Sequence, residues 1–222
     1  MNLTDIIKLC DTNLFLLING FHSSFFDGFM YAVSEKFIWF PLYISVLFVL
    51  IKHWTKESIW LVLIFILCIV VSDQVSSDIL KNLVKRLRPS HVENLKGLVH
   101  LVNGYTGGKF GFASSHAANA IGFATLSSLV LNKRIYTYSI FACAIIIAYS
   151  RIYLGVHYPL DVFGGILIGV IAALGCYWLI VKFRPSLIQP NVNVTIEKQV
   201  IMVPVLVLYI SYSGIIVLSI FH

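Results

Sequence analysis

Three short stretches of the 222-residue chain hold residues suited to binding and transferring phosphate. They are Lys81 to Pro89, Ser114 to His116, and Ser150 to Asp161. Lysine and arginine can hold phosphate oxygens, and an imidazole can carry a proton near neutral pH. Because the three stretches lie beside apolar segments, they predict a phosphate-handling site at a membrane surface.

The first stretch places its cations at the end of an expected helix. Polar residues recur there every three or four positions: Asp73, Ser77, Lys81, Lys85 and Arg88. A helix would align them on one side, and Pro89 is expected to stop it just after Arg88. Lys81 and Arg88 would then be separated by about 10 Å along the axis and reach one phosphate. The alternative is that these residues only anchor the helix end among lipid headgroups.

The second stretch opens an expected helix with Ser114, Ser115 and His116. Backbone N–H groups at a helix N-terminus favour an anion, while His116 can give or take a proton. The two serine hydroxyls can also simply cap the helix, and His116 can be an interfacial histidine that contacts water. The second stretch alone therefore does not decide between a site and a helix cap.

The third stretch predicts a paired histidine and carboxylate. Pro159 suits the first turn of a helix, so His157 should lie just outside that helix and Asp161 in its first turn. A carboxylate that accepts a proton from one imidazole nitrogen leaves the other free as a nucleophile. Gly155 would bring Arg151 into the same site, where its planar fork can hold two phosphate oxygens. An ion pair between Arg151 and Asp161 is the alternative.

The elements that must position these residues are membrane helices. With 59% hydrophobic and 12% charged residues, the composition is typical of an integral membrane protein. Six segments approach the ~20 apolar residues that a spanning helix needs: Phe37–Lys52, Glu57–Leu80, Ser115–Leu131, Tyr136–Tyr153, Pro159–Val181 and Val200–Phe221. The expected fold is all-α, a polytopic membrane helical bundle of about six transmembrane helices.

The organisation expected for the chain is an N-terminal interfacial amphipathic segment, 1–33, followed by a transmembrane domain, 34–222. Residues 1–33 are too polar for a comfortable crossing. Small residues at Gly165, Gly169 and Ala173 predict close helix packing within the bundle, with dimerisation as the alternative. The chain has a formal charge of +6 but no run of basic and aromatic residues. Anionic lipid headgroups, and not nucleic acid, are therefore the expected partner.

The three stretches resemble the motifs of the type 2 phosphatidic acid phosphatase and vanadium haloperoxidase superfamily, in its membrane lipid phosphatase branch. That family carries K-x6-R-P, then P-S-G-H, then S-R-x5-H-x3-D. The first and third motifs stand here unaltered. In the second, Ala113 and Ser115 replace proline and glycine. If the family's glycine needs a positive φ or a close backbone approach, Ser115 must meet that need with a side chain.

The resemblance implies a role for each matched residue. His157 would attack phosphorus to give a phosphohistidine, Asp161 would orient His157, and His116 would protonate the departing oxygen. The remaining matched residues would hold the phosphate oxygens: Lys81, Arg88, Ser114, Ser115 and Arg151. The reaction would then be metal-independent and need no cofactor.

Several functions fit this set. The first choice is hydrolysis of undecaprenyl diphosphate in a bacterial plasma (inner) membrane, with the site on the non-cytoplasmic face. The alternatives within the same class are lipid A, phosphatidylglycerol phosphate and phosphatidate. Two other classes are a lipid phosphotransferase, which the same residues permit, and an anion transporter that uses the ionisable residues as a relay.

Overall fold

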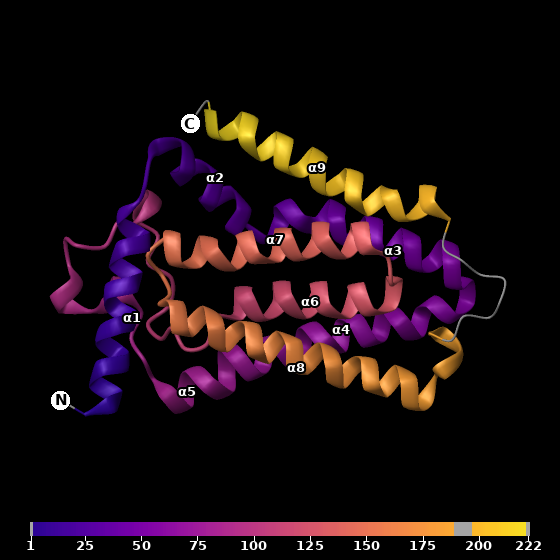
Figure 1. Cartoon of the computed structure of the whole chain (residues 1–222), viewed down its shortest axis with the longest axis horizontal. Coiled ribbons are helices and arrows are strands. Elements are labelled where there is room, and N and C mark those ends of the chain that lie inside the picture. Colours follow the sequence, from indigo (N-terminus) through magenta and orange to yellow (C-terminus); the bar gives the residue numbers. More distant parts are fainter. Residues whose placement is uncertain (1, 189–196, 221–222) are drawn as a thin grey trace.

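The protein folds into a long helical bundle in a computed structural model that describes residues 2–188 and 197–220 (Figure 1). The helices are α1 (Leu3–Gly20), α2 (Ser24–Ser34), α3 (Phe40–Trp54), α4 (Ser58–Gln74), α5 (Lys81–Val84), α6 (Ser115–Leu131), α7 (Arg134–Tyr153), α8 (Pro159–Phe183) and α9 (Lys198–Ile220). A π-helical segment, Val75–Leu80, joins α4 to α5, and short 3₁₀ turns occur in the connections. The all-α prediction is confirmed.

The predicted spans correspond to α3, α4 with its extension, and α6 to α9. Four segments are long and apolar enough to cross a membrane: Lys36–Val84, Arg134–Tyr153, Pro159–Phe183 and Gln199–Ile220. The first of these contains α3 and α4, which meet at Thr55, where φ is 48°. Helix α6, with 17 residues, is shorter than each of these four segments. The predicted end of the last span, Phe221, lies outside the described residues.

Small residues bring α6 and α8 into backbone contact. A side chain at Gly165 would collide with the Ser114 carbonyl, and one at Gly169 would collide with the Ala118 carbonyl. This confirms the predicted close packing of these glycines within the bundle. Because Ser114 is the N-cap residue of α6, the same contact fixes the start of α6 against the first turns of α8.

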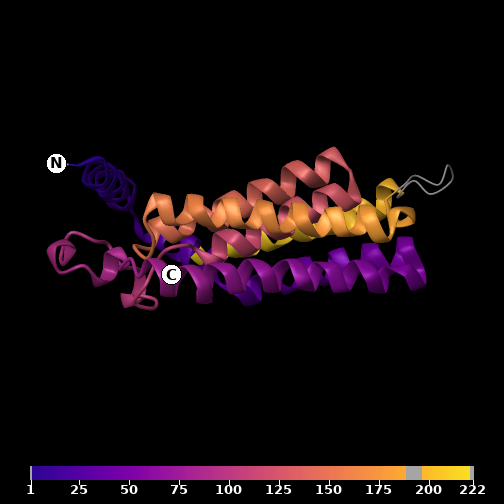
Figure 2. The ribbon, with the colours of Figure 1, turned by 90° about the horizontal axis from the view of Figure 1, so that it is seen from below.

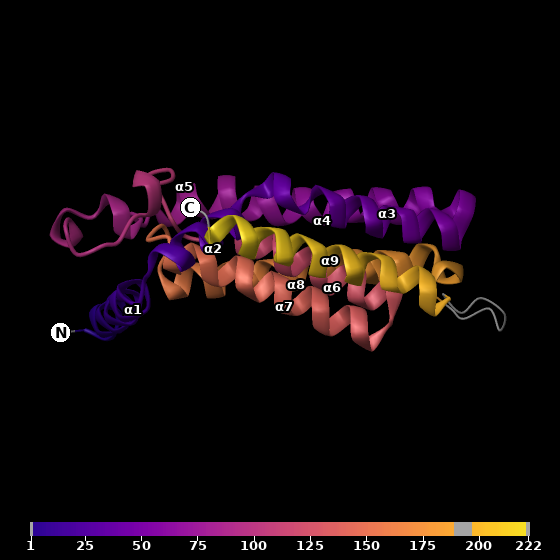
Figure 3. The same cartoon turned by 90° about the horizontal axis from the view of Figure 1, so that it is seen from above.

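The helices form two layers when the bundle is viewed from its sides. Helices α3 and α4 make one layer, and α6, α7, α8 and α9 lie against it (Figures 2 and 3). The largest buried cluster fills the space between the layers and includes Phe65, Leu126, Tyr136 and Ile201. The core therefore lies along the middle and far part of the bundle, away from α1.

The N-terminal segment forms two helices with different surroundings. Helix α1 lies across one end of the bundle, whereas α2 runs along α7 and α9 (Figure 1). In α1 the apolar Leu3 and Leu17 are exposed, while Asp11 and Asn19 are buried against the bundle. Helix α1 thus exposes apolar side chains and buries two polar ones, and its place at a membrane interface stays a prediction.

The end of the second span differs from the prediction. The helix stops at Val84, and Lys85 takes a left-handed conformation with φ of 49°. Beyond it the chain is extended, with the Arg88 N–H donating to the Lys109 carbonyl at 3.1 Å and the Gly111 N–H to the Arg86 carbonyl at 2.8 Å. The expectation that Pro89 ends the helix was wrong, because pairing with the segment around Phe110 stops it four residues before Arg88.

Candidate active site

His157 and Asp161 lie next to each other at the start of α8. The turn before them requires Gly155, whose φ is 75° and where a Cβ would lie 2.7 Å from the His100 carbonyl oxygen. Within the first turn of α8, the Tyr158 N–H donates to Asp161 Oδ2 at 3.1 Å. His157 Nδ1 is 3.5 Å from the same oxygen. The predicted placement of His157 outside the helix and Asp161 within its first turn agrees with this geometry.

Arg86, and not Arg151, forms the ion pair with Asp161. Arg86 Nη1 lies 3.1 Å from Asp161 Oδ1. Arg151 instead donates to the Ser34 hydroxyl and, at 3.2 Å, to the Tyr105 hydroxyl. The alternative of an Arg151–Asp161 ion pair is therefore wrong, and Arg151 has no carboxylate partner among its described contacts.

Four buried atoms of the predicted site have no hydrogen-bond partner among the described residues. They belong to Arg88 (Nη1), Ser114 (Oγ), Arg151 (Nε) and His157 (Nδ1). Each of these residues is at most 7% exposed. Buried polar groups are normally satisfied, and two cationic donors with one hydroxyl are the chemistry that holds a phosphate. All three sequence motifs contribute to this set.

The serine hydroxyls at the start of α6 do not cap the helix, which was the alternative role predicted for them. Ser114 is the N-cap residue, but its side chain makes no capping hydrogen bond. Its backbone N–H donates to the Asp161 carbonyl at 2.9 Å, which ties the second motif to the third. Ser115 begins the helix and is absent from the positive-φ residues. Serine in place of the family's glycine therefore requires no left-handed backbone here.

Burial and nearby cations govern the electrostatics of the site. The pKa of His157 lies well below its usual value because the imidazole is buried, and Arg88, Arg151 and Lys81 lower it further. Burial also lowers the pKa of Arg88, and the neighbouring Arg151 adds to this effect. A neutral imidazole among cations has the protonation state of a nucleophile and the surroundings of an anion-binding site.

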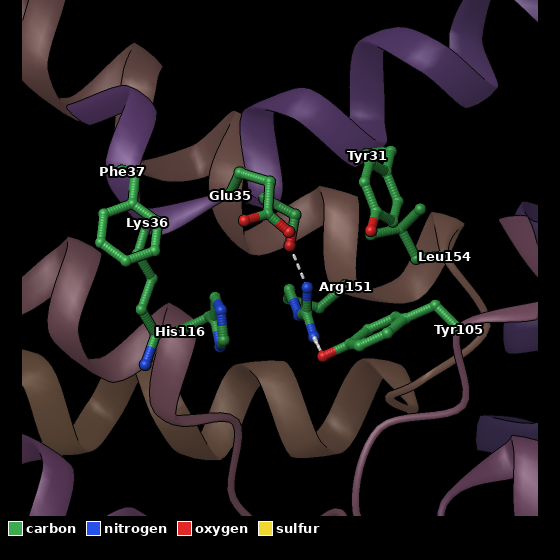
Figure 4. Close-up of a pocket in the computed structure, with 9 residues that line it drawn as sticks. Tyr31, Glu35, Lys36, Phe37, Tyr105, His116, Arg151 and Leu154 are labelled. Carbon is green, nitrogen blue, oxygen red and sulfur yellow. Dashed lines mark hydrogen bonds between the residues drawn. The ribbon is translucent and has the colours of Figure 1, made fainter. Parts of the chain in front are cut away.

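A cavity of about 240 Å³ opens beside His116 and Arg151. Figure 4 shows Lys36 and His116 on one side, Tyr105 on the other and Arg151 between them. The cavity is lined by Tyr31, Ser34, Glu35, Lys36, Phe37, Tyr105, His116, Arg151 and Leu154. Most of these lie outside the three motifs. The sequence did not predict that residues from Tyr31 to Phe37 form a wall of this cavity. The only signal there was Lys36, a lysine just before a predicted span.

Asn19 of α1 holds the connections around the site together. Its amide donates to the carbonyls of Tyr153, at 2.7 Å, and His100, at 3.0 Å. Its oxygen accepts from the His100 N–H at 2.8 Å. The end of α7 and the long connection before α6 are therefore fixed to α1. Across residues 2–188 and 197–220, no group of three or more His, Cys, Asp and Glu side chains is arranged to hold a metal ion.

Comparison with known proteins gives a consistent result. The family model described as PAP2 superfamily matches residues 57–185. The chain is 45% identical to a lipid A 4'-phosphatase of Bacteroides thetaiotaomicron over 72% of each chain. It is 40% identical to that of Porphyromonas gingivalis, over 72% of this chain and 69% of the relative. An undecaprenyl-diphosphatase of Sulfolobus acidocaldarius is 29% identical over 72% and 73%.

Two solved structures have the same architecture. The crystal structure of LpxE from Aquifex aeolicus superposes with a TM-score of 0.60 and 29% identity, covering 75% of this chain and 94% of that one. A PAP2-type phosphatidylglycerolphosphate phosphatase from Bacillus subtilis gives 0.61 and 19%, covering 81% and 88%. At 19% identity the second likeness concerns the fold alone.

Proposed function

Because the chain belongs to the PAP2 superfamily and is one of its membrane lipid phosphatases, we propose that its substrate is the phosphate of a lipid A. The observation that carries this choice is the 45% and 40% identity to two lipid A 4'-phosphatases, against 29% to the undecaprenyl-diphosphatase. From the sequence, undecaprenyl diphosphate was the first choice and lipid A was among the alternatives, although the motif residues do not separate the two. The similarities support the alternative better.

In the proposed reaction His157 attacks phosphorus through Nε2, and the bond from phosphorus to the lipid oxygen breaks. His116 gives a proton to that departing oxygen, while Asp161, whose Oδ2 lies 3.5 Å from His157 Nδ1, orients the imidazole. Water then attacks the phosphohistidine, with His116 taking its proton. Inorganic phosphate leaves and His157 is neutral again, so protons and bonds balance over the cycle.

In the proposed reaction, the phosphate oxygens accept hydrogen bonds from side chains that have no other partner, among the described residues, for a buried polar atom. Arg88, Arg151 and Ser114 each retain a buried atom without a partner. Lys81 and the backbone around Ser115 complete the proposed set. Fixed donors of this kind stabilise the charge on a transferring phosphoryl group, so we propose that hydrolysis is independent of metal.

The proposed setting is a bacterial plasma (inner) membrane, with the site on its non-cytoplasmic face as the family resemblance suggests. Residues 34–222 form the proposed phosphatase domain, and residues 1–33 the proposed interfacial segment. That segment also contributes Tyr31 to the cavity wall. A lipid phosphate would therefore meet residues of both parts.

The test is phosphate release by the purified protein in detergent, with EDTA present. The panel is lipid A, undecaprenyl diphosphate, phosphatidylglycerol phosphate and phosphatidate, each beside His157→Ala. We expect the fastest release from lipid A and none from the variant. Faster release from undecaprenyl diphosphate would restore the first choice made from the sequence. A phosphorylated acceptor as main product would instead identify a phosphotransferase.

A further inference from the structure

Arg86 connects two carboxylates that are almost completely buried. Its Nη1 lies 3.1 Å from Asp161 Oδ1 and its Nη2 lies 2.6 Å from Asp11 Oδ2. The Asp161 and Asp11 side chains are 0% and 2% exposed, whereas that of Arg86 is 21% exposed. A buried carboxylate needs a charged or hydrogen-bonding partner to stay ionised. Arg86 provides one for both.

The position of Arg86 is fixed from several directions. Its guanidinium lies over the Tyr158 ring, 3.9 Å from the centroid. Its carbonyl accepts from the Gly111 N–H at 2.8 Å. Asp11, the second partner, also accepts from the Leu160 N–H at 3.0 Å through its other oxygen. The planar fork is therefore held between α1 and the first turn of α8.

The two oxygens of Asp161 have separate partners as a result. Oδ1 accepts from Arg86, while Oδ2 accepts from the Tyr158 N–H and faces His157 Nδ1. A carboxylate bound on both sides has one orientation, and that orientation presents Oδ2 to the imidazole. A Cβ at Gly111 would lie 2.7 Å from Oδ2, so the loop passes close to this side of the carboxylate.

Arg86 differs in this respect from the other two arginines near the site. Arg88 and Arg151 each keep a buried nitrogen without a partner, as a phosphate ligand should. Both terminal nitrogens of Arg86 are occupied by carboxylates, and Arg86 does not line the cavity. Its contacts lead to Asp161 and not to a bound anion.

We propose that Arg86, anchored by Asp11 of α1, is a positioning residue that orients Asp161 toward His157. The inference rests on the proposed phosphohistidine mechanism, because it assigns to Arg86 an effect on the nucleophile through Asp161. Arg86 touches neither substrate nor reacting atoms in this role. The interfacial helix α1 thereby takes part in catalysis through one aspartate.

The test compares kcat and KM of Arg86→Met, Arg86→Lys and Asp11→Asn, with Lys96→Met as the control. Lys96 is an exposed cation on the same connection, paired with Glu93 at 2.8 Å. We expect Arg86→Met to lower kcat about 10-fold to 100-fold with KM within about twofold, since the lost interaction acts on the transition state. Arg86→Lys should recover part of kcat, Asp11→Asn should lose a few-fold, and the control should be unchanged.

A double-mutant cycle makes the inference falsifiable even if Arg86→Met folds poorly. If Arg86 acts through Asp161, then Arg86→Met or Asp11→Asn should change kcat little in an Asp161→Asn background. Multiplicative losses in that background, or a raised KM with unchanged kcat, would overturn the proposal. Phosphate release that depends on His157 supports the proposed function, whatever the Arg86 and Asp11 variants do. The proposed function and the positioning role of Arg86 can therefore fail separately.

Discussion

The two ends of the bundle differ in whether they bury charged side chains. At the far end, Arg184 and Glu57 form an ion pair at 3.9 Å with side chains that are 45% and 55% exposed. At the end covered by α1, Arg151 and Asp161 are 2% and 0% exposed. Exposed pairs contribute little to stability, whereas buried charges are costly and are usually kept for a purpose. The difference supports the proposed site at the α1 end.

Two buried serines of α6, Ser127 and its N-cap Ser114, differ in a similar way. In the far half of α6, Ser127 donates to the Phe123 carbonyl at 2.7 Å. At the start of α6, Ser114 is equally buried but has no partner for its hydroxyl. A buried hydroxyl gains its stabilisation from a hydrogen bond, so an unpartnered one beside cationic side chains is suited to bind an anion.

The largest effect that would sharpen this comparison is expected from the two arginines. Arg151→Met should lower kcat/KM on the order of 10²-fold to 10³-fold, because it removes a donor aimed at the phosphoryl group. Arg184→Met, at the far end, should stay within about twofold. Steady-state kinetics on lipid A measure both. Equal losses at the two ends would remove the basis for the comparison.

The next effect concerns the two serines. Ser114→Ala should lower kcat/KM about 10-fold to 100-fold, as expected for a hydrogen bond to a charged group. Its melting temperature should not fall, since no protein partner is lost. Ser127→Ala should do the reverse, with nearly unchanged kinetics and lower stability. A Ser114→Ala variant with wild-type kinetics would show that its free hydroxyl does not meet the substrate.

A smaller effect is expected at the cavity wall. Lys36 lines the cavity near His116 but is exposed, so its attraction for an anionic headgroup is screened. Lys36→Met should raise KM about threefold to tenfold at low salt and leave kcat nearly unchanged. The difference should shrink at high salt. A fall in kcat with constant KM would place Lys36 in the chemical step instead.

The smallest effect is a pH dependence of stability. Burial and neighbouring cations hold the pKa of His157 below its unfolded value of about 6.5. The unfolded chain therefore binds a proton first, and stability falls as pH drops below about 6.5, by at most about 1.4 kcal/mol per pH unit from this group. Thermal unfolding between pH 7.5 and 5.5 should show a smaller fall in His157→Gln than in wild type.

The sequence predicted the helices and the motif residues for different physical reasons. Hydropathy marks a span because every turn of it meets lipid or core, so α7 and α8 were placed within a few residues. The motifs were recognisable because phosphate chemistry needs particular side chains at fixed spacing. Roles for His157, His116 and the remaining motif residues stay predictions until variants are measured.

What the sequence could not predict depends on contacts between distant segments. The helix end at Val84 is set by pairing of Leu87 with Phe110, and neither residue is a helix breaker. The cavity wall at Glu35 and Tyr105 comes from segments without any motif. Periodicity and spacing describe a chain locally, so contacts of this kind leave no signal in one sequence.

The glycine contacts between α6 and α8 also decide where the fatty chains of a bound lipid can lie. With Gly165 against the Ser114 carbonyl and Gly169 against that of Ala118, no acyl chain fits between these two helices. The cavity instead reaches Phe37, which is 74% exposed at the start of the first span. For the proposed lipid substrate, the open route to the cavity therefore passes Phe37, with the fatty chains outside the α6–α8 contact.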